Sequence, residues 1–406
     1  MSIFLHILGF VLFLYLFCSI AYLLVIAVAG MFYHHPEMAP ATSFARIAVL
    51  FTSYKDDEVI LSTVPSSLAH DYPRDKFHVF VVADSLRPAT LDTLRSFGAS
   101  VVTIDAKMKA RSLNKGLESI PEEEYDLVMV LDADNIMLPG TLGKVNDAFH
   151  AGYDAIQCHR TAKNEDTPIA LMDGISEEIN NHFFRLGQQA LGFSAAPSGS
   201  GMAFRFSLIR SILRLPEILD NPGEDREIDL QLLKRGIHMY YLPDAWVLDE
   251  KVATHEVFEK QRVRWLEAQW YHLRRLLQPD MKAVQHDRYY TSKLIQNLLL
   301  PRSLYIVVFF FILVLMLMER IFQLNLFFPE SGWWLSLGLF FILTLVIAMP
   351  SRYFSWWTLK AVLALPLLLF SMLKALLRVK SKRREFLHTP KTYKGNVHNG
   401  NGHNGH

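Results

Sequence analysis

The sequence predicts an α/β domain with a mostly parallel sheet, flanked by transmembrane helices. Residues 47–131 alternate short apolar segments with helical ones, whereas residues 3–32 and several stretches beyond residue 294 are long and apolar. The chain of 406 residues is 51% hydrophobic and 20% charged. This composition is too apolar for a wholly soluble protein and too charged for one that lies entirely in lipid.

Strands and helices alternate in the first half of the central region. We expect strands at Ile47–Thr52, His78–Ala83, Ser100–Ile104 and Leu127–Leu131, and helices at Asp57–His70, Pro88–Phe97 and Ala110–Ser119. Alternation at this spacing predicts a parallel sheet with right-handed crossovers. Ligands of such sheets bind beyond the carboxyl ends of the strands. The residues that follow each strand are therefore the candidates for function.

The first apolar stretch predicts a membrane anchor. No charged side chain occurs from Ile3 to Phe32, and a helix needs about 20 apolar residues to cross a bilayer. A cleaved signal peptide is the alternative, because Ala27-Val28-Ala29 resembles a cleavage site. The length of the stretch and the lack of a basic flank before it favour an uncleaved anchor.

Further membrane segments are expected after residue 294. Leu304–Met318 and Ser331–Ser351 read as spans, whereas Tyr353–Leu373 contains a lysine and a proline and could be an interfacial helix. If the central region is cytosolic, three C-terminal spans would place the basic residues 380–384 outside the cell, against the positive-inside rule. Two C-terminal spans would keep these residues in the cytosol. We therefore predict an anchor (1–33), a cytosolic domain (34–290), a membrane region of two or three helices (291–378) and a basic, then low-complexity tail (379–406).

Charge and cysteine content exclude several classes of function. Lys and Arg number 41 and Asp and Glu 40, so the net charge of +1 gives no reason to expect a nucleic-acid partner. Only Cys18 and Cys158 are present, which rules out a disulfide framework and a thiolate zinc site. No G-x-G-x-x-G follows the first strand and no P-loop motif occurs, which disfavours a dinucleotide dehydrogenase or a P-loop ATPase.

Polar residues follow three of the expected strands. Thr52 and Tyr54 follow the first, Asp84 the second, and Asp132 and Asp134 the fourth. Two carboxylates on one loop suit a hard cation such as Mg²⁺ or Mn²⁺, which leaves coordination positions for phosphate oxygens. The alternative is ordinary turn chemistry, because aspartate favours loop starts.

Two later segments are also candidates. The glycines of Ser198–Arg205, Gly201 among them, would let the backbone approach a ligand, although a tight turn would use them equally. Glu224 and Asp225 open a helical stretch, where acidic residues suit the helix dipole. In a functional interpretation, one of these carboxylates is a general base.

The segment Gln261-Arg-Val-Arg264-Trp265 would place its glutamine, second arginine and tryptophan on one helix face. Such an arginine could clamp a phosphate and the tryptophan could stack on a sugar ring. An interfacial helix anchored at lipid headgroups by the same residues is the alternative.

Taken together, these motifs resemble the family 2 inverting glycosyltransferases, in particular the processive membrane synthases of cellulose, chitin, hyaluronan and poly-N-acetylglucosamine. The resemblance covers roughly residues 47–270 and rests on a series in one order: Thr52-Ser-Tyr54, Asp84, Lys109-Ala-Arg-Ser-Leu-Asn114, Asp132-Ala-Asp134, Gly201 with Arg205, Gly223-Glu-Asp225 and Gln261-x-x-Arg264-Trp265. It implies a GT-A fold, which is Rossmann-like and mostly parallel.

The resemblance also implies roles for individual residues. Thr52, Tyr54 and Asp84 would hold the uracil and ribose of a UDP-sugar, and Lys109 its diphosphate. Asp132 would contact the nucleotide, Asp134 the Mg²⁺ or Mn²⁺, and Asp225 would be the catalytic base. The remaining substrate-binding positions would be Gly201, Glu224, Gln261, Arg264 and Trp265, the last three holding the pyrophosphate and the acceptor end of the glycan.

The expected partners follow from this resemblance. They are a UDP-sugar donor, a polysaccharide acceptor, membrane lipids and, for export, a partner subunit or a second copy of the chain. The expected location is the bacterial inner membrane, with the catalytic domain in the cytosol because the donor is cytosolic. Two alternatives stay open: a single transfer to a polyprenyl or other lipid-linked acceptor, and a non-catalytic membrane scaffold.

Overall fold

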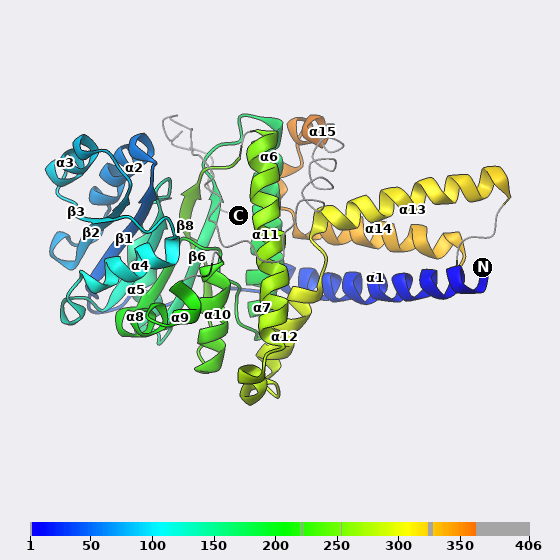
Figure 1. Ribbon diagram of the computed structural model, residues 1–406, viewed down its shortest axis with the longest axis horizontal. Coiled ribbons are helices and arrows are strands. Elements are labelled where there is room, and N and C mark those ends of the chain that lie inside the picture. The colour runs from blue at the N-terminus through cyan, green and yellow to red at the C-terminus, as the bar shows by residue number, and fades with distance from the viewer. Residues whose placement is uncertain (1, 220, 222, 253, 324–327, 363–406) are drawn as a thin grey trace. The chain divides into compact units, whose positions relative to one another are not determined.

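The computed structural model describes residues 2–362 except 220, 222, 253 and 324–327 (Figure 1). The described residues form two compact units. The sheet unit contains residues 36–174 and 196–252, and the helical unit contains residues up to 35, residues 175–195 and those from 254 onward. Each unit is described by itself.

The sheet unit is built on one eight-stranded sheet in the order β3-β2-β1-β4-β7-β6-β8-β5. The pairs β1–β2, β1–β4, β2–β3 and β6–β8 are parallel, whereas β7 runs antiparallel to β4 and β6 and β5 runs antiparallel to β8. The strands are β1 (Ile47–Tyr54), β2 (Phe77–Asp84), β3 (Ser100–Ile104), β4 (Leu127–Asp132), β5 (Ile136–Met137), β6 (Ala155–Ala162), β7 (Met202–Arg205) and β8 (Tyr240–Asp249).

Helices pack on both faces of this sheet. Its helices are α2 (Asp57–Leu68), α3 (Pro88–Ser96), α4 (Lys109–Glu118), α5 (Thr141–His150), α8 (Phe206–Leu213), α9 (Pro216–Leu219) and α10 (Glu224–Lys234). Val49 and Phe51 share a buried core with residues of α2, α3 and α5. On the opposite face α4 lies so close that a Cβ on Gly116 would be 2.6 Å from a methyl group of Val82. This glycine lets α4 approach β2, and the start of α4 carries a site residue.

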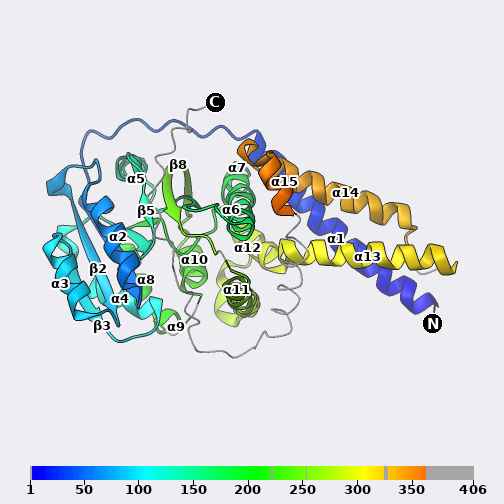
Figure 2. The ribbon, with the colours of Figure 1, turned by 90° about the horizontal axis from the view of Figure 1, so that it is seen from above.

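The helical unit contains α1 (Ser2–Met31), the part of α6 (Pro168–Asn181) from Ile175 on, a π-helical turn (His182–Leu186) and α7 (Gly187–Ala190). It continues with α11 (His255–Leu276), α12 (Arg288–Leu298), α13 (Arg302–Phe322), α14 (Ser331–Ala348) and α15 (Trp356–Val362). In both views α1, α13 and α14 lie side by side (Figures 1 and 2). Leu16, Tyr305 and Trp334 meet in their shared apolar core.

Three of these helices are long and apolar enough to cross a membrane: Ile3–Met31, Arg302–Phe322 and Ser331–Ala348. They match the expected anchor and the first two expected C-terminal spans. Only the start of the third expected segment is described, as a 3-10 turn (Ser351–Tyr353) and α15. The rest of that segment, the basic residues 380–384 and the tail lie outside the described residues, and the division into domains stays a prediction.

Candidate active site

The predicted polar residues of the first strands share one edge of the sheet. In the parallel register Thr52 lies opposite Asp132, and Tyr54 lies opposite Asp84. The strands extend slightly further than the sequence predicts, because β1 includes Tyr54, β2 includes Asp84 and β4 includes Asp132. The carboxyl ends of β1, β2 and β4 therefore present these side chains together.

Asp84 organises the loop that precedes α4. Its side chain is almost fully buried. One oxygen, Oδ2, accepts hydrogen bonds from the backbone N–H groups of Lys107 (2.7 Å) and Ala106 (3.3 Å), and Oδ1 accepts one from the hydroxyl of Ser85 (3.0 Å). Lys107 adopts a positive φ of 52°. Asp84 thus fixes the backbone immediately before Lys109.

Lys109 is the centre of the site. Its Nζ lies 2.5 Å from Oδ1 of Asp132, 3.7 Å from Oε1 of Glu224, and donates a 2.7 Å hydrogen bond to the carbonyl of Gly199. The four residues come from α4, β4, the loop before β7 and the first turn of α10. Lys109 is the first residue of α4, and a positive charge at a helix N-terminus is unfavourable with the helix dipole. The carboxylates of Asp132 and Glu224 therefore stabilise the charge of Lys109.

The charges in this cluster shift the pKa values of two side chains. Burial would lower the pKa of Lys109, but the carboxylates of Asp132 and Glu224 outweigh it and raise that pKa above its ordinary value. Burial raises the pKa of Glu224 to about 7, although Lys109 opposes the shift; the nearby Asp225 adds to it. Carboxyl groups with such raised pKa values often occur at functional sites.

Asp225 lies next to the backbone that Lys109 contacts. Gly199 has a φ of +86°, and a Cβ added there would be 3.6 Å from Oδ2 of Asp225. Asp225 follows Glu224 in the first turn of α10, so both carboxylates also suit the dipole of that helix. We call residues 198–201 the glycine loop, and Lys109 with Asp132 and Glu224 the Lys109 cluster. The first turn of α10 and the glycine loop together bring Asp225 close to the Lys109 cluster.

The glycine loop is held by one buried amide. Gln157 of β6 accepts a hydrogen bond from Ser198 N at 2.8 Å and donates to the carbonyls of Ser200 and Gly201, each at 3.1 Å. Gly201 has a φ of +63° and its amide donates to Val130 of β4 at 2.9 Å. Gly201 is thus a structural link between β4, β6 and the loop that carries Gly199.

The turn after β4 is braced by the end of β8. Asn135 accepts from the backbone N–H of Asp132 (3.0 Å) and donates to Oδ1 of Asp249 (3.1 Å). Asp134 is fully buried, and its Oδ2 accepts a 2.7 Å hydrogen bond from the backbone N–H of Glu250. These contacts hold the backbone of the turn at Asp132 and fix the direction of the Asp134 side chain.

The donor set fits a cation that is shared with a phosphate ligand. Within the described part of the chain no group of three or more His, Cys, Asp or Glu residues could hold a metal alone. Mg²⁺ is commonly bound through one or two protein carboxylates together with substrate phosphates. Asp132 and Asp134, on one turn beside a lysine, provide such an incomplete oxygen set.

Gln261, Arg264 and Trp265 lie on α11 of the helical unit, as the sequence predicts for a helical motif. Arg262, between them, lies over the rings of Phe258 and Trp265, at 4.5 and 4.2 Å from the ring centroids. The predicted contacts of the three residues with a donor or acceptor stay predictions.

Comparisons with known proteins show the family to which the chain belongs. Residues 45–268 match the family described as glycosyltransferase like family 2. The chain belongs to this family. It is 28% identical over 243 residues to cellulose synthase 2 of Novacetimonas hansenii, which covers 57% of this chain and 15% of that protein. It is 25% identical over 234 residues to an N-acetylglucosaminyltransferase of Rhizobium meliloti, with 54% of each chain covered.

A solved structure supports the fold of this family 2 glycosyltransferase. The mannosyltransferase PcManGT of Pyrobaculum calidifontis, in complex with GDP-Man and Mn²⁺, superposes with a TM-score of 0.51 at 16% identity, covering 89% of this chain and 95% of that one. The α/β sheet is therefore a GT-A fold, and the chain is a glycosyltransferase. The sequence relatives agree with a polysaccharide-synthase type, but the chain spans only about half or less of their lengths.

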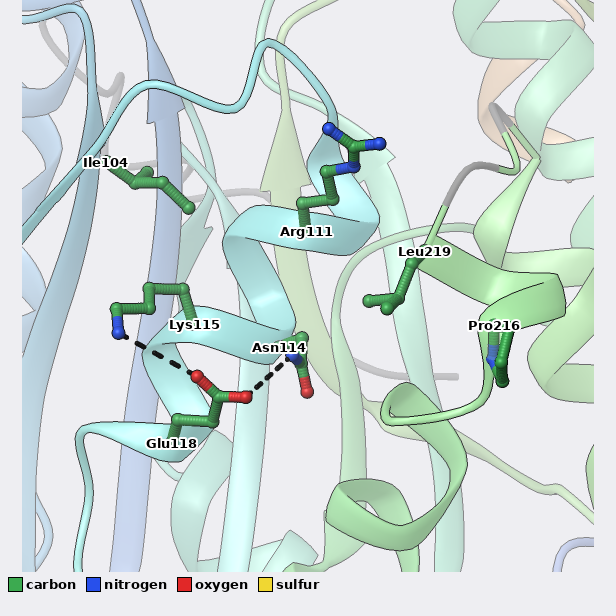
Figure 3. Close-up of a pocket in the computed structure, with 7 residues that line it drawn as sticks. All are labelled: Ile104, Arg111, Asn114, Lys115, Glu118, Pro216 and Leu219. Carbon is green, nitrogen blue, oxygen red and sulfur yellow. Dashed lines mark hydrogen bonds and ion pairs between the residues drawn. The ribbon is translucent and has the colours of Figure 1, made fainter.

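A surface pocket of about 390 Å³ lies on the sheet unit between α4 and α9 (Figure 3). Its polar lining is largely engaged, because Glu118 accepts from Asn114 at 3.0 Å and lies 3.8 Å from Nζ of Lys115. The Lys109 cluster does not line it. Asn114, although part of the family motif, therefore lies on the outer side of α4.

Several site residues were not predicted individually from the sequence. Gly199 and Asn135 lie within or beside predicted motifs, so their positions gave a signal, although not their contacts. Gln157 and Asp249 lie on strands of the second half of the sheet, where no local motif marks them. Their roles follow only from the pairing of distant segments.

Proposed function

We propose that this family 2 glycosyltransferase transfers a sugar from a UDP-sugar to a growing β-linked polysaccharide, with inversion at the anomeric carbon. The observation that carries the proposal is the meeting of Asp225 with the Lys109 cluster. Lys109 joins Asp132 to the carbonyl of Gly199, and Gly199 is the residue beside Oδ2 of Asp225. A candidate base and a candidate diphosphate-binding group are thereby brought together.

The donor would lie along the carboxyl edge of the sheet. Thr52, Tyr54 and Asp84 would hold the nucleoside, since they lie at the carboxyl ends of β1, which pairs with β4, and of β2, which pairs with β1. Lys109 would bind the diphosphate, with Asp132 contacting the nucleotide. The names of the cellulose synthase and the N-acetylglucosaminyltransferase support a hexose or N-acetylhexosamine donor.

Asp132 and Asp134 would hold a divalent cation, with Asp134 as the direct ligand. The Mn²⁺ named for PcManGT supports this assignment, and either Mg²⁺ or Mn²⁺ suits oxygen ligands. The ion would neutralise the charge that grows on the departing diphosphate.

In the transfer step Asp225 accepts the proton of the acceptor hydroxyl. The hydroxyl oxygen forms a bond to the anomeric carbon from the face opposite the nucleotide, while the bond from that carbon to the diphosphate oxygen breaks. The electron pair leaves with UDP, whose negative charge Lys109 stabilises more strongly in the transition state than in the donor. Glu224 holds Lys109 in position for this task.

The acceptor end of the glycan would be held by α11. Trp265 offers a flat apolar surface for a sugar ring and Arg264 a planar cation for the pyrophosphate, with Gln261 beside them on the helix. The three apolar helices would anchor the enzyme in a bacterial inner membrane with its sheet unit in the cytosol, where nucleotide sugars are made. Export of the polymer would involve a partner subunit or a second copy.

The test uses membranes that contain the full chain. They are incubated with a panel of radiolabelled UDP-sugars and Mg²⁺ or Mn²⁺, and the product is sized by gel. We expect label from one donor in long, alkali-stable chains, and about 10²–10⁴-fold slower incorporation by membranes carrying Asp225→Asn. A single sugar on a lipid-soluble product would support transfer to a polyprenyl carrier, and no incorporation from any donor would contradict the proposal.

A further inference from the structure

A buried glutamine on β6 supports the glycine loop from outside the predicted motifs. Gln157 is fully buried, and its strand lies between β7 and β8 in the sheet. In the strand register Gln157 lies opposite Met202 on one side and Tyr241 on the other. Strands inside a sheet core are the most stable part of a fold. Gln157 therefore projects from a rigid support.

The side-chain amide of Gln157 binds the glycine loop at three points. Its Oε1 accepts a hydrogen bond from Ser198 N at 2.8 Å. Its Nε2 donates to the carbonyls of Ser200 and Gly201, each at 3.1 Å. These three residues lie on both sides of Gly199 in the chain. Gln157 therefore fixes the position of the Gly199 carbonyl, although none of the three bonds is to Gly199 itself.

Two of these loop bonds have a second donor. The carbonyl of Gly201 also accepts from Cys158 N at 2.8 Å, and the carbonyl of Ser200 also accepts from the hydroxyl of Ser198 at 3.0 Å. The bond from Ser198 N to Gln157 has no substitute among the residues that the structure describes. Loss of the amide would therefore release the loop at Ser198 without leaving either carbonyl unsatisfied.

Gly199 connects the loop to two functional side chains. Its carbonyl accepts the 2.7 Å hydrogen bond from Nζ of Lys109, and a Cβ added to it would be 3.6 Å from Oδ2 of Asp225. The same ammonium also lies beside the carboxylates of Asp132 and Glu224. Without the Gly199 carbonyl in place, the two carboxylates alone would determine where the ammonium lies.

We infer that Gln157 is a positioning residue, which acts through the Gly199 carbonyl to place the Lys109 ammonium for the donor diphosphate and Asp225 for the acceptor. Because Gln157 is fully buried, it acts without touching either substrate. The inference rests on the proposed function, since it requires Lys109 to bind the diphosphate. It adds to that function a residue that lies in none of the predicted motifs.

The test is a double-mutant cycle between Gln157→Met and Lys109→Met, with UDP binding measured by calorimetry on the purified full chain in detergent with Mn²⁺. Methionine has about the length of glutamine, so it fills the same space without the loop bonds. Gln157→Met should raise the UDP Kd about tenfold, because the hydrogen bond that orients a charged group is disturbed. In the Lys109→Met chain the same change should alter the Kd by less than about twofold, because two residues that act through one contact are not additive.

Transfer is measured on the same preparations with the active donor. Gln157→Met should lower kcat by up to about 10²-fold, because a displacement of about 1 Å in a reacting group can have an effect of this size. Gln157→Asn keeps the amide but is one methylene shorter. It should also weaken UDP binding, and it serves if Gln157→Met does not fold.

The matched control is Asn146→Leu on α5. Asn146 is a similarly buried amide that accepts from Ala45 N at 2.8 Å and donates to the carbonyl of Ser43 at 3.1 Å. These contacts precede β1 and therefore lie at the amino edge of the sheet, opposite the candidate site. Asn146→Leu should lower the Tm and leave the UDP Kd and kcat of the folded chain at their wild-type values.

The outcomes separate this inference from the proposed function. A UDP Kd within about twofold of wild type in the folded Gln157 variants would overturn the inference alone. An equal loss of affinity from Gln157→Met in the wild-type and Lys109→Met chains would do the same, as would an equal loss in Asn146→Leu. UDP binding that is unaffected by Lys109→Met would contradict the proposed role of Lys109, and this inference with it.

Discussion

Replacing Glu224 by glutamine should stabilise the protein at alkaline pH and have little effect at acid pH. Glu224 is buried, and its pKa rises from an ordinary value of 4.5 to about 7. A raised carboxyl pKa means that the folded state holds the proton more tightly than the unfolded state does. The wild-type protein therefore loses stability between about pH 4.5 and 7, and keeps that loss at higher pH.

The size of the effect follows from the two pKa values. A shift of one unit in the pKa corresponds to about 1.36 kcal/mol, so the rise of the Glu224 pKa from 4.5 to about 7 lowers the free energy of unfolding at alkaline pH by about 3 kcal/mol. Glutamine resembles the protonated carboxyl in shape and does not ionise, so it removes this loss. For a unit of this size, about 3 kcal/mol corresponds to a rise in Tm of about 6–12 °C.

The assay is thermal unfolding of the purified full chain in detergent from pH 5 to 9. The Tm difference between Glu224→Gln and wild type should be near zero at pH 5 and reach its plateau above pH 7. The control is Glu123→Gln, on an exposed 3-10 turn, which should show no such trend. A Glu224→Gln chain that is equally or less stable than wild type at pH 8 would refute the reasoning, because the charged carboxylate would then be favoured by Lys109 overall.

Three further predictions concern the same site. Asn135→Ala removes the link between Asp132 and Asp249, so it should lower the free energy of unfolding by about 2 kcal/mol and also lower the rate of sugar transfer. A Tm equal to that of wild type in the thermal unfolding assay would argue against the link. Gly199→Ala should cost about 1–2 kcal/mol, because its φ is +86°, and should reduce transfer by crowding Asp225; wild-type kcat would contradict this. EDTA should abolish transfer and added Mn²⁺ or Mg²⁺ restore it, whereas full activity in chelator would exclude the proposed metal.

The first half of the sheet could be predicted closely from the sequence. Ser100–Ile104 is a strand with the predicted bounds, and β1 and β2 differ from the prediction by two residues or fewer at each end. Apolar runs bounded by turn residues give a strong local signal. The carboxyl-edge placement of Asp84 and Asp132 then follows from the parallel topology.

The contacts of the site could not be predicted in the same way. Lys109 and Gly199 are 90 residues apart, and the sequence alone does not specify that one donates a hydrogen bond to the other. The bracing of the turn after β4 by Asp249 depends on β8, which is separated from β4 in the sheet by β7 and β6. Such contacts arise from long-range pairing, for which hydrophobic periodicity provides no signal.

The most direct test separates nucleotide binding from transfer in Asp225→Asn. UDP binding is measured by calorimetry on the purified full chain with Mn²⁺, and transfer with the active donor is measured on the same preparation. The account predicts a UDP Kd within about twofold of wild type and a rate lower by about 10²–10⁴-fold, the usual contribution of a general base. Transfer at the wild-type rate, or loss of UDP binding together with transfer, would contradict it.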